Sequence, residues 1–287
     1  MARRLSAADP ANAVVTDSIS PQMFRRIAEL IQSRTGIRMP TSKIHLIEGR
    51  LMRRAREAGA ACIDDYCRAV LKAQPDDPIM TDFFNAVTTN KTDFFREPAH
   101  FDVLAERVVP AWRASGRRLL RCWSAAASTG MEAYTLAIVL DQALGEGEDF
   151  EIVATDLDTR VLAEARRGIY RSEDVLPVPV QLRDTYFARA RDSRRAEVRV
   201  VPELRGKVAF GQLNLMEAHY PLGELMDVIF CRNVLIYFEK DTQNAVVARL
   251  CARLRPGGHL FLGHSESIHN FDLPLEAVAH TVFRKKG

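Results

Sequence analysis

The sequence has 287 residues, 47% hydrophobic and 27% charged, which is ordinary for a globular protein of one large or two smaller domains. Its formal net charge of +3 is too small to indicate a nucleic-acid-binding protein. No apolar run approaches the ~20 residues that cross a bilayer, and the N-terminus lacks the apolar core of a secretory signal. The five cysteines are widely spread without a C-x-x-C pair, so we expect a cytoplasmic protein with reduced cysteines.

The first third of the chain is predicted to be helical. Residues 1–20 lack periodicity and are expected to form a flexible leader. Apolar residues at helical spacing follow, and they define an all-α domain over residues 21–88, in which Gly36 ends the first helix. Further helices are expected over residues 42–58, 62–73 and 78–88.

The helix expected over residues 42–58 carries more positive than negative charge. Two interpretations stay open at this point. The charges form an ordinary solvated face, as on most charged helices, or they form a docking surface for an acidic partner. The cations are Lys43, Arg50, Arg53, Arg54 and Arg56, and the acids are Glu48 and Glu57.

Residues 88–98, with the sequence TTNKTDFFREP, combine hydrogen-bonding side chains with two adjacent phenylalanines. An inter-domain linker with capping residues rarely carries paired phenylalanines. The segment is therefore predicted to be structured and to contribute to a site, and a helix is expected over residues 99–111.

Residues 119–134 are the centre of the predicted architecture. An apolar run through Trp123 leads into a loop of very small residues that ends at Gly130, and a helical pattern follows. Strand, small-residue turn and helix is how open α/β sheets bind a nucleotide-like cofactor. Because Gly130 is the loop's only glycine, the loop alone is equally consistent with an ordinary tight turn.

The α/β pattern continues with a strand over residues 150–154, followed by Asp156, placed to accept ribose hydroxyls, and by Asp158 as a helix cap. Residues 170–205 interrupt it and are predicted to form an inserted antiparallel β-subdomain. A helix ending in Leu-Arg-Pro-Gly-Gly before an apolar strand is common in class I S-adenosylmethionine methyltransferases. Later strands are expected over residues 207–211, 227–231, 259–263 and 281–284.

Six motifs occur in order between residues 88 and 267: TTNKTDFFRE, WSAAASTGMEAY, ATDLD, NLME, FCRNVLIYF and GHSES. Together with the helical N-terminal domain, they resemble the chemotaxis-receptor glutamate methyltransferases of CheR type. The resemblance implies a class I, Rossmann-like methyltransferase domain over residues 89–287. It implies methyl transfer from S-adenosyl-L-methionine to glutamates on the cytoplasmic helices of chemoreceptors, giving glutamate 5-O-methyl esters and S-adenosyl-L-homocysteine. We also expect no metal, no nucleic acid, no membrane insertion and a monomer.

The resemblance also implies roles for individual residues. Asp156 matches the ribose-binding acid, Asn214 with Leu215 the adenine-side pair, and Arg96 with Tyr237 the catalytic pair nearest the transferring methyl group. The residues that match cofactor-binding positions are Asn90, Thr92, Arg96, Glu132, Asp156, Asn214, Leu215, Asn233 and Val234.

The chain departs from the family pattern at two places. Where the family has E-E-P-Y, this chain has Met131 and Ala133 in place of the first acid and the proline, so Glu132 stands alone. The glycine-rich hairpin with which some members bind a receptor's C-terminal pentapeptide has no glycine in residues 190–196. We therefore expect direct docking without pentapeptide tethering, through Arg50, Arg53, Arg54 and Arg56.

Two alternatives remain: a methyltransferase for another acceptor, and a non-catalytic S-adenosylmethionine-binding scaffold. Enzymes that methylate amino groups of nucleic acids often carry N-P-P-Y after the fourth strand. Residues 233–237, NVLIY, lack both prolines and argue against that chemistry. Retention of the site residues argues against a scaffold; these are Arg96, Glu132, Asp156, Asn233 and Tyr237.

Overall fold

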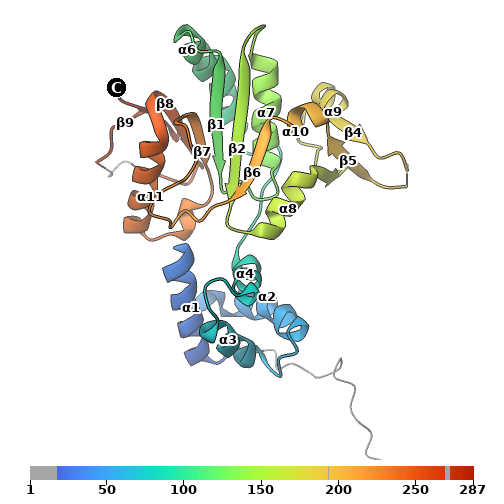
Figure 1. Ribbon diagram of the computed structural model, residues 1–287, viewed down its shortest axis with the longest axis vertical. Coiled ribbons are helices and arrows are strands. Elements are labelled where there is room, and N and C mark those ends of the chain that lie inside the picture. Colours follow the sequence, from blue (N-terminus) through green and yellow to red (C-terminus); the bar gives the residue numbers. More distant parts are fainter. Residues whose placement is uncertain (1–17, 193, 269–271) are drawn as a thin grey trace, which may run out of the picture. The chain divides into compact units, whose positions relative to one another are not determined.

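A computed structural model describes residues 18–192, 194–268 and 272–287 (Figure 1). The chain divides into two compact units, Met1–Thr89 and Asn90–Gly287. Among the described residues, no helix is long and apolar enough to cross a membrane.

The first unit is all-α, as predicted, and its helices begin and end at the residue types that the sequence offers. Ser20 accepts a hydrogen bond from the Met23 N–H, and Gly36 adopts a left-handed φ of 75° that ends the first helix. Asp77 caps the start of the fourth helix by accepting a hydrogen bond from the Ile79 N–H. The helices are α1 (Pro21–Thr35), α2 (Ile44–Glu57), α3 (Ile63–Lys72) and α4 (Pro78–Val87), with a 3₁₀ turn at Thr41–Lys43.

The expected leader is shorter than residues 1–20. Ile19 is buried against the helical core, and its N–H donates to Glu48 at 2.9 Å. The Ser20 N–H donates to Asp64 at 3.0 Å. These contacts make residues 19 and 20 part of the helical unit, while residues 1–17 lie outside the described residues.

The second unit contains a seven-stranded sheet in the order β6-β2-β1-β7-β8-β10-β9. Figure 1 labels all of these strands except β10. The neighbours from β6 to β8 are parallel, and β10 pairs antiparallel with β8 and β9. Every residue of β7 is buried, as expected for a parallel sheet covered on both faces. The strands are β1 (Leu119–Ala125), β2 (Asp149–Asp156), β6 (Val208–Gln212), β7 (Met226–Cys231), β8 (Leu254–Leu262), β9 (Leu275–Ala279) and β10 (Val282–Lys285).

A second, three-stranded antiparallel sheet with the order β3-β5-β4 lies within the predicted insertion. Figure 1 labels its strands β4 and β5. Its strands are β3 (Ile169–Arg171), β4 (Phe187–Arg189) and β5 (Glu197–Val200). The remaining helices are α5 (Ala99–Val103), α6 (Val109–Ala114), α7 (Met131–Ala143), α8 (Thr159–Arg167), α9 (Val180–Tyr186), α10 (Pro202–Arg205) and α11 (Lys240–Arg253). The α/β class with an antiparallel insertion is therefore confirmed.

Two elements differ from the prediction. The helix expected over residues 99–111 is interrupted by a π-helical turn at Leu104–Val108, just before Pro110, whose ring removes one N–H from the helical ladder. Strand β8 begins at Leu254, so the Pro-Gly-Gly run belongs to the strand. A Cβ at Gly258 would stand 2.9 Å from the Asp227 carbonyl oxygen, and this contact explains why glycine is present where β8 approaches β7.

Candidate functional site

The carboxyl ends of four parallel strands meet at one edge of the main sheet. Ala125 of β1 pairs with Thr155 of β2 on one side and with Cys231 of β7 on the other. Cys231 in turn pairs with Leu262 of β8. The chain passes from β1 to β2 and β6 in one direction and then returns to β7, so the strand order reverses beside β1. Open α/β sheets bind their ligands at this switch point.

The loop after β1 requires small residues. Gly130 has a φ of 86°, and a Cβ there would stand 2.8 Å from the Ala165 Cβ and 3.2 Å from the Phe210 ring. Ala126 and Ser128 also adopt left-handed conformations, with φ of 63° and 51°. Such a backbone with little side-chain bulk lets a ligand approach closely at the start of α7.

Asp156, at the end of β2, organises this loop. Its Oδ2 accepts the Ser128 N–H at 2.8 Å, and its Oδ1 accepts the Asp158 N–H at 2.9 Å. Burial raises the pKa of Asp156, and these N–H groups partly offset that effect. Each carboxylate oxygen has a further lone pair, so the residue fits its predicted role of accepting ribose hydroxyls.

Asn90 joins the 88–98 segment to the same loops. Its Nδ2 donates to Asp158 Oδ2 at 2.7 Å, and its carbonyl oxygen accepts the Ser128 hydroxyl at 2.8 Å. Asp158 also caps α8 by accepting the Arg160 N–H, as predicted. The segment is therefore a structured part of the site.

Glu132, in the first turn of α7, faces a buried arginine. Its Oε1 accepts the Ser124 hydroxyl at 2.7 Å, and its Oε2 lies 3.7 Å from Nη1 of Arg232. Arg232 Nη2 lies 3.2 Å from Glu97 Oε2, so one guanidinium, 1% exposed, lies between two carboxylates. Burial raises the pKa of Glu132, whereas the Arg232 charge and the Ser124 hydrogen bond lower it. A buried carboxylate of this kind suits the amino group of the predicted cofactor.

Asn233, directly after β7, has a left-handed φ of 59° and donates its Nδ2 to Glu97 Oε1 at 3.1 Å. Glu266 holds this loop by accepting the N–H groups of Asn233 at 3.0 Å and Leu235 at 2.8 Å. It also accepts the Gly263 N–H at 2.6 Å. Burial acts to raise the pKa of Glu97, but the Asn233 hydrogen bond and the Arg232 charge outweigh it and hold the pKa below its usual range.

Left-handed backbone is concentrated at this edge of the sheet. Left-handed non-glycine residues are energetically unfavourable and cluster where function requires a fixed geometry. Here they occur in the 88–98 segment, in the loop after β1 and in the loop after β7. They are Phe95, Glu97, Ala126, Ser128 and Asn233.

The predicted catalytic pair is half-buried. Arg96 Nη1 donates to the Lys91 carbonyl at 2.9 Å, and the Arg96 carbonyl accepts Nη2 of Arg232. Tyr237 ends the 3₁₀ turn Leu235–Tyr237 that follows the Asn233 loop. Val234 precedes that turn, and its carbonyl accepts the Tyr237 N–H at 3.1 Å.

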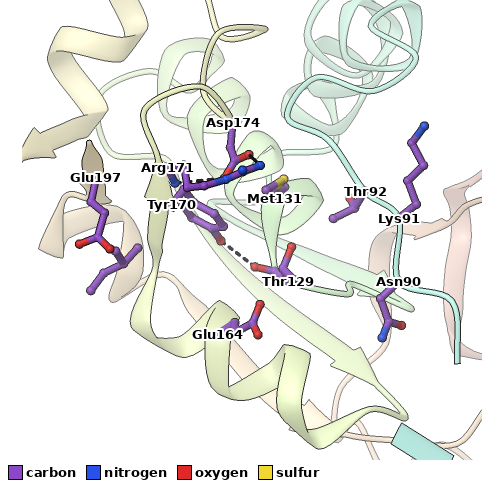
Figure 2. Close-up of a pocket in the computed structure, with 11 residues that line it drawn as sticks. Asn90, Lys91, Thr92, Thr129, Met131, Glu164, Tyr170, Arg171, Asp174 and Glu197 are labelled. Carbon is purple, nitrogen blue, oxygen red and sulfur yellow. Dashed lines mark hydrogen bonds and ion pairs between the residues drawn. The ribbon is translucent and has the colours of Figure 1, made fainter. Parts of the chain in front are cut away.

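A cavity of about 420 Å³ opens beside the loop after β1 (Figure 2). Asn90 and Thr92 line one side of it, and Tyr170 of β3 lines another. The Tyr170 hydroxyl donates to the Thr129 carbonyl at 2.7 Å, which joins the inserted sheet to the loop after β1. The cavity is therefore bounded by both the 88–98 segment and the insertion.

The residues predicted for the adenine side follow β6, whose last residue, Gln212, pairs with Asp156. Asn214 Oδ1 accepts the Met216 N–H at 3.0 Å and so shapes the turn. Leu215 is buried, and its carbonyl accepts Nη2 of Arg249 at 2.8 Å. Both residues thus lie near the β2 end of the same sheet edge.

The arginines predicted for docking differ in their surroundings within the helical unit. Arg50 donates to the carbonyls of Val87 and Thr88 at 2.6 and 2.9 Å, so it stabilises the end of α4. Arg54 is 16% exposed and pairs with Glu57 at 2.6 Å. Arg53, which also pairs with Glu57, and Arg56 are exposed on α2. Docking through this helix stays a prediction, and Arg53 and Arg56 are the two arginines best placed for it.

Sequence reasoning missed three residues that hold the site together, namely Glu97, Arg232 and Glu266. All three stand inside the quoted motifs TTNKTDFFRE, FCRNVLIYF and GHSES, so the motifs themselves were the available signal.

Comparison with known proteins agrees with this geometry. The family model "CheR methyltransferase, SAM binding domain" matches residues 90–283, and "CheR methyltransferase, all-alpha domain" matches residues 22–88. A chemotaxis protein methyltransferase of Klebsiella aerogenes is 42% identical over 267 residues, which cover 92% of this chain and 90% of that protein. The chemotaxis protein methyltransferase 2 of Pseudomonas aeruginosa is 41% identical and covers 91% of each chain. The chain therefore belongs to the CheR methyltransferase family and is an S-adenosylmethionine-dependent methyltransferase of chemotaxis.

Proposed function

We propose that the protein acts in the cytoplasm and methylates glutamate side chains on the helices of chemoreceptors, forming glutamate 5-O-methyl esters. The observation that carries this proposal is the position of the 88–98 segment. Hydrogen bonds and ion pairs from Asn90 and Glu97 hold it against the loops after β1, β2 and β7, so it presents Arg96 at the edge of the sheet.

A carboxylate acceptor suits such a site. A glutamate with a pKa near ~4.3 is already ionised at neutral pH and needs no general base. S-adenosylmethionine, when bound, supplies a sulfonium methyl group whose transfer to the carboxylate oxygen leaves a neutral thioether and a neutral ester, with no proton moved. The chain's task is therefore to position the reactants.

The proposed roles follow from this task. Arg96 holds the acceptor carboxylate through charge-assisted hydrogen bonds. Tyr237 limits the freedom of the groups around the methyl. Glu132 binds the cofactor's amino group and Asp156 its ribose hydroxyls. Arg232 is a positioning residue, because its contacts with Glu97 and Glu132 fix both carboxylates. The protein is proposed to act as a monomer, without pentapeptide tethering.

The acceptor is tested by incubating the protein with radiolabelled S-adenosylmethionine and receptor-containing membranes. Base-labile label on the receptor supports a carboxyl ester. Label on RNA or on a small molecule would indicate another acceptor. Absence of any label from a protein that binds the cofactor would support the scaffold alternative.

The role of Arg96 is tested by Arg96→Ala, with Arg189→Ala as the control because Arg189 is 85% exposed on the inserted sheet. Losing charge-assisted hydrogen bonds to the acceptor should reduce receptor methylation roughly 10- to 100-fold. The control should keep its rate, and circular dichroism should show that both variants fold. Near-full activity of Arg96→Ala would refute the role proposed for Arg96.

A further inference from the structure

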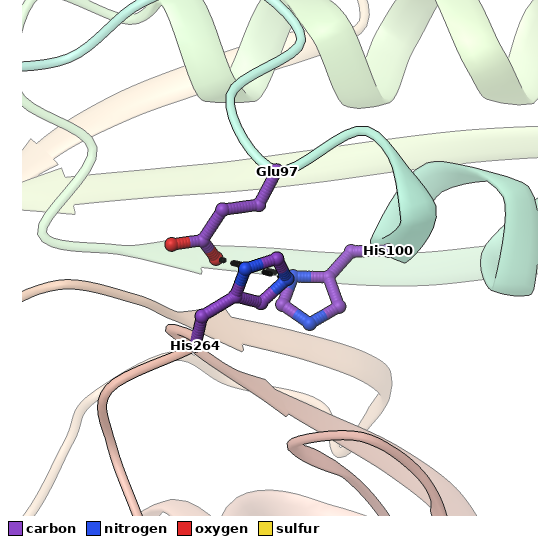
Figure 3. Close-up of side chains that lie close together, drawn as sticks. All are labelled: Glu97, His100 and His264. Carbon is purple, nitrogen blue, oxygen red and sulfur yellow. Dashed lines mark ion pairs between the residues drawn. The ribbon is translucent and has the colours of Figure 1, made fainter.

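Three side chains with metal-binding atoms converge beside the candidate site: Glu97, His100 and His264 (Figure 3). Glu97 Oε2 lies 3.5 Å from His100 Nδ1 and 4.0 Å from His264 Nε2. All three ligand atoms lie within 4.8 Å of one another. Neither histidine has a role in the proposed methyl transfer.

Two of these atoms are buried and make no hydrogen bond of good geometry to the described residues, namely Glu97 Oε2, which is ion-paired with Arg232 at 3.2 Å, and His100 Nδ1. The His100 ring is 2% exposed, and its other nitrogen, Nε2, is hydrogen-bonded to the Thr281 hydroxyl at 3.0 Å. This outer bond fixes the ring so that Nδ1 faces the carboxylate, as outer partners do for metal-binding histidines. A ring nitrogen and a carboxylate oxygen that face each other are stabilised either by a proton on the nitrogen or by a cation that both can bind.

The spacing fits a small divalent transition metal. Tetrahedral Zn²⁺ with bonds of about 2.0–2.2 Å holds its ligand atoms about 3.4 Å apart. The distance of 3.5 Å between Glu97 Oε2 and His100 Nδ1 already matches this value. His264 is 46% exposed, so rotation of its side chain can shorten the distance of 4.0 Å between its Nε2 and Glu97 Oε2. We propose that Glu97 Oε2, His100 Nδ1 and His264 Nε2 bind one divalent transition-metal ion of the Zn²⁺ class, with its fourth position open to solvent.

Arg232 opposes this binding, because its Nη2 lies 3.2 Å from Glu97 Oε2 and repels a second cation. The repulsion is limited, because Arg232 also faces Glu132 and would keep this carboxylate as a partner when a metal binds Glu97. We therefore expect the affinity for the metal to be below that of closed structural zinc sites, and the metal to bind reversibly. This proposal departs from the expectation, drawn from the sequence, that the protein binds no metal.

The test uses the untagged full-length protein, because a histidine tag would itself bind the probe. Co²⁺ is titrated and followed by its visible absorption, and Zn²⁺ is then added as a competitor. One equivalent of Co²⁺ should bind and be displaced by Zn²⁺. His264→Ala should weaken binding about tenfold or more. His219→Ala is the matched control, because His219 is exposed and lies outside the cluster.

A second variant makes the assignment direct. His264→Cys places a thiolate at the same position and should add a thiolate-to-Co²⁺ charge-transfer band that the wild-type N and O ligands cannot produce. Circular dichroism confirms that each variant folds. Equal affinity of His264→Ala and wild type, no charge-transfer band from His264→Cys, or no Co²⁺ binding by wild type would each overturn the proposal. None of these readouts depends on methylation, so failure of the metal site and failure of the proposed function are distinguishable.

Discussion

Gly130 gives the most quantitative prediction, because two separate penalties apply to any side chain there. Its φ of 86° lies in the left-handed region, where an alanine costs roughly 1–2 kcal/mol. In addition, the new Cβ would meet the Ala165 Cβ at 2.8 Å, well inside the ~3.5–4.0 Å of favourable carbon contacts. Overpacking of this kind costs roughly 1–3 kcal/mol. Gly130→Ala should therefore lower the free energy of unfolding by roughly 2–5 kcal/mol.

Gly147→Ala separates the two penalties. Gly147 is exposed in the same unit, and its φ of 74° is similar, but an added Cβ would meet no atom within 4 Å. This control should lose only the backbone part, roughly 1–2 kcal/mol. The difference between the two variants then measures the steric penalty against Ala165 and Phe210.

Urea unfolding followed by tryptophan fluorescence is the appropriate assay. The chain has two tryptophans, Trp112 and Trp123, which are both buried in the second unit, so the signal does not mix in unfolding of the helical unit. The cofactor affinity of Gly130→Ala, measured by calorimetry, should also fall because the loop after β1 must shift. Equal stabilities of Gly130→Ala and Gly147→Ala would refute the close approach of Gly130 to α8.

Three further predictions concern charge. Glu132→Gln should weaken S-adenosylmethionine binding roughly 10- to 100-fold by calorimetry, because a buried charge-assisted contact is lost; an unchanged Kd would exclude Glu132 from the cofactor site. Reversing Arg53 and Arg56 to glutamate should reduce receptor methylation while cofactor affinity stays constant; parallel loss of both would indicate misfolding instead. Burial, assisted by the charge of Arg284, lowers the pKa of His259 from 6.5 to about 4. The unfolded chain therefore binds more protons between these values, and about 3 kcal/mol of stability is lost as pH falls from 6.5 through 4. His259→Gln should reduce this pH dependence of urea unfolding, and an unchanged slope would contradict it.

The sequence predicted most of the architecture because the relevant signals are local. Capping residues such as Asp158, the left-handed Gly36 and the apolar run of β7 each act within a few residues. The two elements that differ from the prediction also have local causes that compete with periodicity. Pro110 widens the preceding turn into a π-helix, and Gly257 and Gly258 allow a strand to continue where Pro-Gly-Gly usually ends an element.

The candidate site was only partly predictable, because its centre depends on distant pairs. Arg232 contacts Glu97 and Glu132, which lie 135 and 100 positions earlier in the chain, and no sequence spacing reveals such a cluster. Glu266 supports the Asn233 loop from 33 positions later in the chain. Arg50 and Arg56 lie on the same helix, but Arg50 donates to carbonyl groups whereas Arg56 is exposed. The sequence of the helix does not reveal this difference.

The left-handed residues around the site have a consequence for the evolution and engineering of this protein. Glycine would relieve backbone strain at Ala126, whose φ is 63°. At Ser128, with a φ of 51°, it would also remove the hydrogen bond from the Ser128 hydroxyl to the Asn90 carbonyl. A stabilising substitution is thus available in the loop proposed to receive the cofactor, and it would also loosen that loop. A search for thermostable variants that does not select for activity will therefore accumulate changes in this loop and yield robust but impaired enzymes.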